Sequence, residues 1–96
     1  MSAYAIFIRE TTRNQSELET YTPKAAASMA GHAMNVLAAY GRQEVWEGSE
    51  MEGIVIVEFP TMADAKAWYE SPAYREAREH RFRGADYRAV LVEGLI

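Results

Sequence analysis

The stretch Glu58–Arg83, EFPTMADAKAWYESPAYREAREHRFR, decides the fold of this chain. It joins the end of an apolar strand to two short helices, and each helix has its own start signal. Thr61 followed by Asp64 forms an S/T-x-x-D/E capping pattern. Ser71-Pro72 places a serine cap before a proline suited to the first helical position. The spacing therefore predicts a helix that breaks and restarts in a new direction before a cluster of basic residues.

The segments on both sides of this stretch are predicted to be strands. Ile54 to Phe59 carries β-branched residues on both faces, which is typical of a central strand. Tyr4 to Arg9 is also mostly apolar on two faces, and Tyr87 to Leu95 ends the chain as a last strand. A weaker strand is expected from Met34 to Tyr40, and after a bend it should continue through Glu44 to Glu47.

The first helix is expected to begin at a capping box, Asn14 followed by Glu17, and to end near Gly31. Apolar residues recur along it at three- and four-residue steps. Pro23 interrupts this pattern, because a proline inside a helix removes a donor and clashes with the preceding turn. Thr22 could cap a fresh segment. We therefore expect a kinked helix or two short ones.

The predicted order is βαββαβ over one domain, residues 1–96, of the α+β class. Right-handed crossovers turn this order into a ferredoxin-like fold, a four-stranded antiparallel sheet with its helices on one face. The other face would then expose an apolar patch. Its expected members are Ile54 and Ile56, joined either by Tyr4, Ile6 and Ile8 or by Ala5 and Phe7. A second subunit that places its own sheet there would cover the patch, so we predict a homodimer.

Composition excludes several classes of protein. Hydrophobic residues make up 49% and charged residues 25% of the 96 residues, which is ordinary for a globular protein and argues against disorder. No apolar run approaches the length of a membrane span, and the N-terminus does not have the pattern of a signal peptide. The formal charge of −4 argues against nucleic-acid binding. The lack of cysteine fits a reducing compartment, so a cytoplasmic location is expected.

Short motifs in ordered spacing cover about the last two-thirds of the chain. They are Tyr40-Gly41, Val45-Trp46-Glu47-Gly48, Glu58-Phe59-Pro60, Ala65, Trp68-Tyr69, Ser71-Pro72, Tyr74, His80-Arg81, Gly84-Ala85-Asp86-Tyr87-Arg88 and Leu91-Val92-Glu93-Gly94. In this order they resemble the domain-of-unknown-function family 1330. The resemblance implies a ferredoxin-like subunit of the dimeric α/β-barrel group. It implies no general activity, because relatives by fold include cofactor-independent monooxygenases, haem-degrading proteins and small-molecule isomerases.

One departure from that family concerns the entry to the second strand. Many members carry a Gly-Gly pair where this chain has His32-Ala33. This difference could place an imidazole near the sheet edge, so His32 joins the candidate ligand-binding residues.

Aromatic residues of the two later helices are candidates for lining a cleft between helices and sheet. Trp68 lies on the inward stripe of its helix, where an aromatic residue is more often part of the core than a ligand contact. Tyr69 and Tyr74 carry hydroxyls that need partners if buried, and these partners could be structural or could belong to a ligand. Tyr87 on the last strand completes the set of candidate ligand-binding tyrosines.

Polar candidates lie at the end of the stretch and on the strand before it. His80 beside Arg81 could bind an anion or carry out acid–base chemistry. The alternative for Arg81 is a salt bridge to Asp86 or Glu93 that holds the helix end to the last strand. Glu58 interrupts an apolar strand face, so it is expected either to pair with an arginine or to act as a general base.

Other chemistries have no support in the sequence. His32 and His80 lack neighbouring ligands at metal-binding spacing, and no glycine-rich phosphate loop occurs, so neither a metal nor a cofactor is predicted. Two functions remain open. The first is a dimeric binding protein or cofactor-free enzyme for a small, partly apolar or anionic molecule. The second is a non-catalytic module that makes structural or regulatory contacts. The predicted catalytic residues are His80 and Glu58, whether or not the protein is an enzyme.

Overall fold

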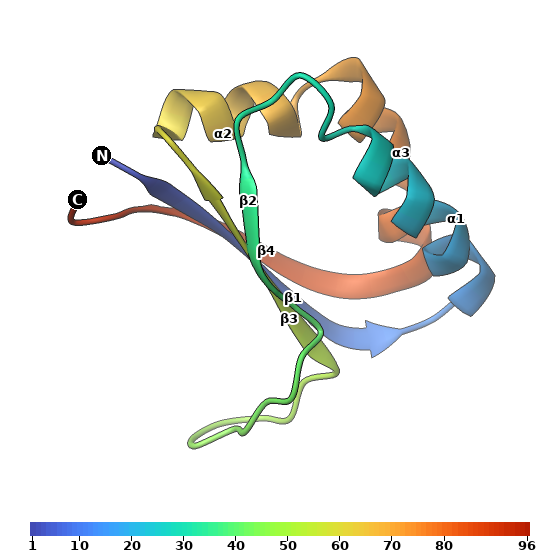
Figure 1. Ribbon diagram of the computed structural model, residues 1–96. Helices are drawn as coiled ribbons and strands as arrows, with labels where there is room; N and C mark the ends of the chain where they lie inside the picture. Colours follow the sequence, from blue (N-terminus) through green and yellow to red (C-terminus); the bar gives the residue numbers. More distant parts are fainter.

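The computed structural model describes all residues from 1 to 96 and has the predicted βαββαβ order. The strands are β1 (Ala3–Thr12), β2 (Asn35–Ala39), β3 (Gly53–Phe59) and β4 (Ala85–Glu93), and the helices are α1 (Gln15–Ala27), α2 (Met62–Tyr69) and α3 (Pro72–Gly84). The strands form one antiparallel sheet in the order β2-β3-β1-β4. All three helices lie over one face of this sheet (Figure 1). The predicted ferredoxin-like α+β fold is confirmed.

The register of the sheet decides which residues of β1 face the helices. Ala3, Ala5 and Phe7 are buried, because their side chains point toward the helical layer. Ile6 pairs with Ile56 of β3 and shares the opposite face with it. Of the two sets that the sequence left open, Tyr4, Ile6 and Ile8 therefore join the uncovered face. Val90 and Val92 of β4 extend this face and are 49% and 46% exposed.

The two start signals of the fold-deciding stretch work as predicted. The Thr61 hydroxyl accepts a hydrogen bond from the backbone N–H of Asp64 at 3.0 Å. The Ser71 hydroxyl accepts one from the N–H of Tyr74 at 3.4 Å, with Pro72 at the first helical position. These caps satisfy amide groups that have no partner within the helix, so the chain can end α2 and begin α3 within two residues.

Of the two alternatives expected for the first helix, two short helices is wrong, because α1 is a single helix that passes through Pro23 and ends at Ala27. Thr22 does not cap a new segment, and its hydroxyl instead donates a hydrogen bond to the carbonyl of Leu18 at 3.1 Å. Contacts to α3 occur on both sides of the proline. Before it, Tyr21 bonds Tyr74, and after it, Lys24 pairs with Glu76 at 3.0 Å. Packing against α3 thus outweighs the local preference for a break.

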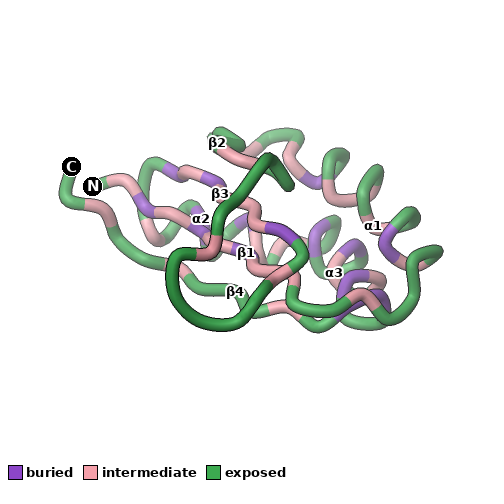
Figure 2. The backbone as a smooth tube through the Cα atoms, turned by 90° about the horizontal axis from the view of Figure 1, so that it is seen from below, coloured by how far each residue is buried: buried purple, intermediate pink, exposed green.

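The predicted continuation of the second strand through Glu44 to Glu47 is also wrong. β2 ends at Ala39, and residues 41–52 form a loop that projects from the end of the sheet (Figure 1). β3 begins only at Gly53, so residues 44–47 have no neighbouring strand with which to pair. Figure 2 shows this loop as mostly exposed, and Trp46 within it is 89% exposed. The irregularity in the β2–β3 pairing lies earlier, between Val36 and Ala38.

The core lies between the sheet and the three helices. Phe59 and Tyr74 are its largest fully buried side chains, and Trp68 is 4% exposed. The Trp68 ring lies 4.0 Å from the Tyr74 ring and 5.6 Å from the Phe59 ring, measured between centroids. Its indole N–H donates a hydrogen bond to the buried hydroxyl of Ser28 at 3.1 Å. Trp68 therefore anchors α2 to the sheet and to the end of α1.

Gly84 permits the close approach of α1 and α3. A Cβ atom at this position would lie 2.7 Å from Leu18 Cδ2 and 3.2 Å from the Leu18 backbone nitrogen. We expect Gly84→Ala to lower the free energy of unfolding by about 1–3 kcal/mol, because the helices would have to move apart. Gly41→Ala is the matched control, since nothing lies within 4 Å of its Cβ position. Surface substitutions usually change the free energy of unfolding by less than about 0.5 kcal/mol. Urea titrations in which both variants stay within this range of the parent protein would contradict the expectation.

Candidate functional site

A cavity of about 250 Å³ lies between α1 and the sheet, and we call it the α1 cavity. Its walls come from β1, α1, β2, β3, α2 and β4, and thirteen of its fourteen lining residues are hydrophobic. Tyr21, Tyr40 and Tyr87 are the lining residues that bring phenol hydroxyls. The space is smaller than a pocket for a drug-sized ligand, so it suits a small and mainly apolar molecule.

Two pairs of tyrosine hydroxyls lie at this site. Tyr21 of α1 and Tyr74 of α3 share a hydrogen bond of 2.8 Å. Tyr40, directly after β2, and Tyr87 of β4 share one of 2.5 Å. Because β2 and β4 are the two edges of the sheet, the second pair spans the helix-covered face from edge to edge. We call these four residues the tyrosine cluster.

Arg81 of α3 supplies the positive charge beside the tyrosine cluster. It is only 3% exposed, and its guanidinium lies 5.3 Å from the Phe7 ring and 5.0 Å from the Tyr87 ring, both of which line the α1 cavity. None of the ion pairs in the structure includes Arg81, and its Nε is buried without a hydrogen-bond partner. Arginine stays protonated in proteins, so this is a buried cation without a counter-charge.

The expected salt bridge from Arg81 to Asp86 or Glu93 is therefore absent. Asp86 instead pairs with Arg13, whose Nε lies 2.8 Å from its Oδ1. Arg13 also donates to the carbonyl of Phe82 at 2.6 Å. Arg13 thus links the end of α3 to β4, a role that the sequence analysis had considered for Arg81.

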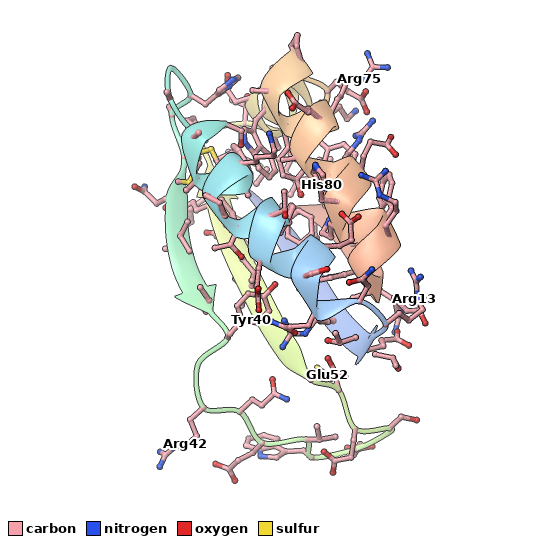
Figure 3. All side chains as sticks on the ribbon, turned by 90° about the vertical axis from the view of Figure 1, so that its right-hand side faces the viewer. Arg13, Tyr40, Arg42, Glu52, Arg75 and His80 are labelled. Atoms are coloured by element: carbon pink, nitrogen blue, oxygen red, sulfur yellow. The ribbon has the colours of Figure 1, made fainter.

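A second arginine lies near the other end of the Tyr40–Tyr87 pair. The Arg9 guanidinium stacks 4.7 Å from the Tyr40 ring and pairs with Glu52 at 3.0 Å. Hydrogen bonds from Thr12, together with the nearby Arg9, hold the pKa of the Glu52 carboxyl below its usual value of 4.5. Arg9 and Glu52 therefore neutralise each other at pH 7. Tyr40 and Glu52 lie toward the same end of the sheet, where the loop leaves it (Figure 3).

Burial controls the acidity of three tyrosines of this cluster. It raises the pKa of the hydroxyls of Tyr21, Tyr40 and Tyr74 above the usual 10.0, while the positive charge of Arg81 opposes the shift in all three. The net direction is upward, so these hydroxyls keep their protons at neutral pH. A protonated phenol beside an uncompensated guanidinium can donate a hydrogen bond to an anion.

The structure brings together four of the residues that the sequence singled out: Trp68, Tyr74, Arg81 and Tyr87. Trp68 and Tyr74 are mainly core residues, as the sequence favoured for Trp68. Tyr69 lies to one side, with its ring 4.4 Å from the Arg78 guanidinium. It lines a separate apolar cavity of about 240 Å³ beside α2 and β4.

Glu58 and His32 lie away from the α1 cavity. Glu58 is on the uncovered face of the sheet, where it accepts hydrogen bonds from Tyr4 at 3.4 Å and from Asn35 at 3.5 Å. It is not paired with an arginine. Glu58 and Ala33 line a polar depression at the end of the sheet, and His32 directly precedes Ala33 on the connection from α1 to β2. Their proposed roles in catalysis and ligand binding stay predictions.

His80 is on the surface where α1 and α3 meet, as Figure 3 shows, and it lines none of the four main cavities. Its Nδ1 lies 2.6 Å from Glu17 Oε2, and Arg83 Nε lies 3.3 Å from the other oxygen of the same carboxylate. Glu17 was predicted to belong to a capping box. Asn14 does cap α1 by accepting from the Glu17 N–H, but the Glu17 side chain turns to α3 instead of returning to Asn14. A catalytic role for His80 also stays a prediction.

The His80–Glu17 contact predicts a pH effect on stability. The hydrogen bond from His80, with that from Arg83, lowers the pKa of Glu17 below 4.5 in the folded protein. A lowered carboxyl pKa contributes stability above the unfolded value, and this contribution is lost as the pH falls through the folded value. We expect Glu17→Gln to be slightly less stable than the parent protein at pH 7, with a smaller difference at pH 3. Urea titrations at both values measure this.

Glu19→Gln on the same helix is the control, because Glu19 makes no ion pair. It should show no comparable pH dependence. A Glu17→Gln difference that stays constant from pH 7 to pH 3 would exclude a charge-dependent contact.

Sequence reasoning missed Tyr21, Tyr40 and Arg9. Tyr21 was counted only among the apolar residues of the first helix, and Tyr40 only as the end of a strand and as part of a family motif. A signal for Tyr40 was present in the glycine that follows the β2–β3 loop. A Cβ on Gly53 would lie 2.4 Å from Tyr40 Cδ1, so the glycine makes room for this ring. Tyr40 itself has a φ of 55°, a conformation that residues other than glycine rarely adopt.

No group of three or more histidine, cysteine or acidic side chains in the structure is arranged to hold a metal ion. None of its helices has the length and apolar character needed to cross a membrane.

Comparison with known proteins yields a family and a set of solved structures. The family model described as domain of unknown function, DUF1330, matches residues 2–95. No functionally curated protein matches the chain. The chain is similar to the RPA0582 protein of unknown function from Rhodopseudomonas palustris, with 16% identity, a TM-score of 0.79, and coverage of 99% of this chain and 83% of that one.

Two further solved structures broaden the comparison. A dimeric ferredoxin-like protein of unknown function from Thermobifida fusca is 16% identical with a TM-score of 0.70, over 98% of this chain and 92% of that one. SnoaB, a cofactor-independent oxygenase from Streptomyces nogalater, is 8% identical with a TM-score of 0.62, over 99% and 94%. At these identities the likeness extends to the fold alone.

Proposed function

Since the chain belongs to the DUF1330 family, whose function is unknown, we propose from the site itself that the protein binds a small, partly apolar, anionic molecule in the α1 cavity. The observation that carries this proposal is Arg81, a buried guanidinium without a carboxylate partner beside an apolar cavity. A buried charge without a counter-charge is costly, and an anionic ligand would remove that cost on binding.

We also propose that the protein is a homodimer with two sheets packed face to face. The uncovered face carries Ile6, Ile8, Ile54 and Ile56 in adjacent register, with Val90 beside them. A patch of this kind on a soluble protein usually marks an interaction surface. The neighbours from Thermobifida fusca, Jannaschia and Bacteroides fragilis are described as dimeric, which supports a dimer here, whereas the face-to-face packing rests on the apolar face itself.

Screening by thermal shift and native mass spectrometry, with a library of small acids and neutral molecules, tests the binding function. We expect the molecules that bind to be acids. Arg81→Met should lower their affinity by about 10-fold or more, because it removes a charge-assisted hydrogen bond. Arg81→Lys should recover part of the affinity. Hits whose affinity is the same for Arg81→Met as for the parent protein would contradict the proposed site.

Cavity filling gives an independent control on the location. Ala25 lines the α1 cavity and Ala27 lies exposed on the same helix. We expect Ala25→Leu to abolish binding of the molecules found in the screen and Ala27→Leu to leave their binding unchanged. The same titrations with His80→Ala decide its predicted role, since loss of binding would support it. Retained binding would leave His80 as a link between α1 and α3.

A cofactor-independent enzyme is the second candidate function. The tyrosine cluster beside Arg81 favours it, because phenol hydroxyls and a guanidinium can stabilise negative charge that develops on a bound molecule. A non-catalytic module is the alternative. It draws support from His80, Arg13 and Arg78, which are paired with Glu17, Asp86 and Glu70 and are therefore not free for chemistry. Binding without turnover of any identified ligand would favour this alternative.

A further inference from the structure

The charges around the α1 cavity point to the class of anion, provided that the proposed binding function holds. Two guanidiniums lie near the Tyr40–Tyr87 pair, Arg81 and Arg9. Arg9 is neutralised by Glu52 at 3.0 Å, whereas Arg81 has no counter-ion. The buried net charge is therefore a single positive charge. A monoanion would balance it, and a dianion such as a phosphate monoester would leave one uncompensated negative charge in an apolar site.

The hydrogen-bonding groups at the site also suit a carboxylate. A carboxylate has two oxygens with about four acceptor positions, and a guanidinium can donate two parallel hydrogen bonds to it. Tyr40 and Tyr87 both line the cavity, and their hydroxyls are hydrogen-bonded to each other. An anion between them and Arg81 would accept a hydrogen bond from each of the two hydroxyls.

Of the Tyr40–Tyr87 pair, Tyr40 is the residue that is expected to move when a ligand binds. It lies at the end of β2, immediately before the loop of residues 41–52, and it is 44% exposed. Its φ of 55° places it in a sparsely populated backbone conformation. Strain of this kind in a non-glycine residue often occurs at ligand-binding positions. Tyr87 is instead held within β4, where Arg81 packs against its ring.

We propose that the α1 cavity takes an apolar monocarboxylate whose carboxylate binds Arg81 and the hydroxyls of Tyr40 and Tyr87, with Tyr40 releasing Tyr87 as the ligand enters. The apolar part of the ligand packs among the hydrophobic residues of α1 and β2. Tyr40 is then a ligand-binding residue, and the Tyr40–Tyr87 hydrogen bond closes the empty site.

Three probes with the same phenyl body test the class of ligand: 3-phenylpropanoate, 3-phenylpropanamide and 2-phenylethyl phosphate. Amide chemical shifts of ¹⁵N-labelled protein are followed at pH 7.5 during titration with each. We expect the carboxylate to bind about 10-fold or more tightly than the amide, as for a hydrogen bond between charged groups. It should also bind more tightly than the phosphate. In Arg81→Met the preference for carboxylate over amide should disappear.

Tyr40→Phe tests the proposed role of the Tyr40 hydroxyl, and Tyr4→Phe on the uncovered face is the matched control. We expect Tyr40→Phe to lower the affinity for 3-phenylpropanoate by about 5-fold, which is the scale of one hydrogen bond. Its affinity for 3-phenylpropanamide should stay unchanged. The control should change neither. An unchanged carboxylate affinity in Tyr40→Phe would overturn the role of Tyr40, and tightest binding of the phosphate would overturn the choice of a monoanion.

The outcomes separate this inference from the function on which it rests. If 3-phenylpropanamide or 2-phenylethyl phosphate shifts the resonances of the α1 cavity residues as strongly as 3-phenylpropanoate does, the monocarboxylate inference fails. Small-molecule binding would then still stand. If no phenyl probe shifts those residues, both fail.

Discussion

Trp68→Ala is expected to lower the free energy of unfolding by about 3–5 kcal/mol, the range for removal of a buried aromatic side chain. The Trp68 ring packs on Tyr74, Phe59 and Phe7, and its N–H satisfies the buried Ser28 hydroxyl. The substitution would leave a cavity and would remove one of the two hydrogen bonds of the Ser28 hydroxyl, which also donates to the Ala25 carbonyl. Because a small domain has only about 5–15 kcal/mol of stability, this loss should be visible as a much lower urea midpoint or as failure to fold.

The second tryptophan provides the matched control. Trp46 is 89% exposed in the loop of residues 41–52, so Trp46→Ala should stay within about 0.5 kcal/mol of the parent protein. Unfolding of both variants can be followed by circular dichroism, which does not depend on the tryptophans that remain. If the two substitutions had equal effects, the anchoring role of Trp68 would be wrong.

Ile56→Asp is expected to convert the proposed homodimer into a monomer. Ile56 lies in β3 opposite Ile6, within the apolar face that a second sheet would cover. Two-fold symmetry would bring one aspartate from each subunit into the interface. A buried and unpaired charge costs several kcal/mol, so the dissociation constant should rise at least about 100-fold. In the monomer the aspartate would face water, and the fold should remain.

Sedimentation velocity over a range of micromolar concentrations measures this effect. Ile96→Asp is the control, because it makes the same chemical change at a side chain that is 93% exposed. It should sediment as the parent protein does. A parent protein that is monomeric throughout this range would refute the dimer, and a dimeric Ile56→Asp would refute the face-to-face packing.

The fold could be predicted from the sequence because its decisive signals are local. Caps at Thr61 and Ser71 and the apolar pattern of β3 each act over a few residues, and the structure confirms them. The errors occurred where distant contacts overruled local preference. Pro23 was expected to kink α1 or divide it in two, and the division does not occur, because α1 contacts α3 on both sides of the proline. Residues 44–47 have strand-like composition but lack a neighbour with which to pair.

The site was predictable only in part, because it is assembled from both edges of the sheet. Arg81 and Tyr87 were named from the sequence. The sequence did not indicate that Asp86 pairs with Arg13, so that it is not a counter-ion for Arg81. Tyr40 and Tyr87 are far apart in the sequence and meet only through the strand order. His80 was favoured for its position beside Arg81. Adjacent residues on a helix point in different directions, and His80 faces Glu17 on the surface.

The irregular register in β2 has a consequence for how copies of the chain can assemble. β2 is an edge strand of only five residues, and its pairing with β3 shifts between Val36 and Ala38. A short, interrupted edge is a poor template for adding another strand from a neighbouring molecule. Growth of the sheet from this side into an open polymer is thereby discouraged. The proposed association through the apolar face would instead give a closed pair, because the same face of each copy covers that of the other.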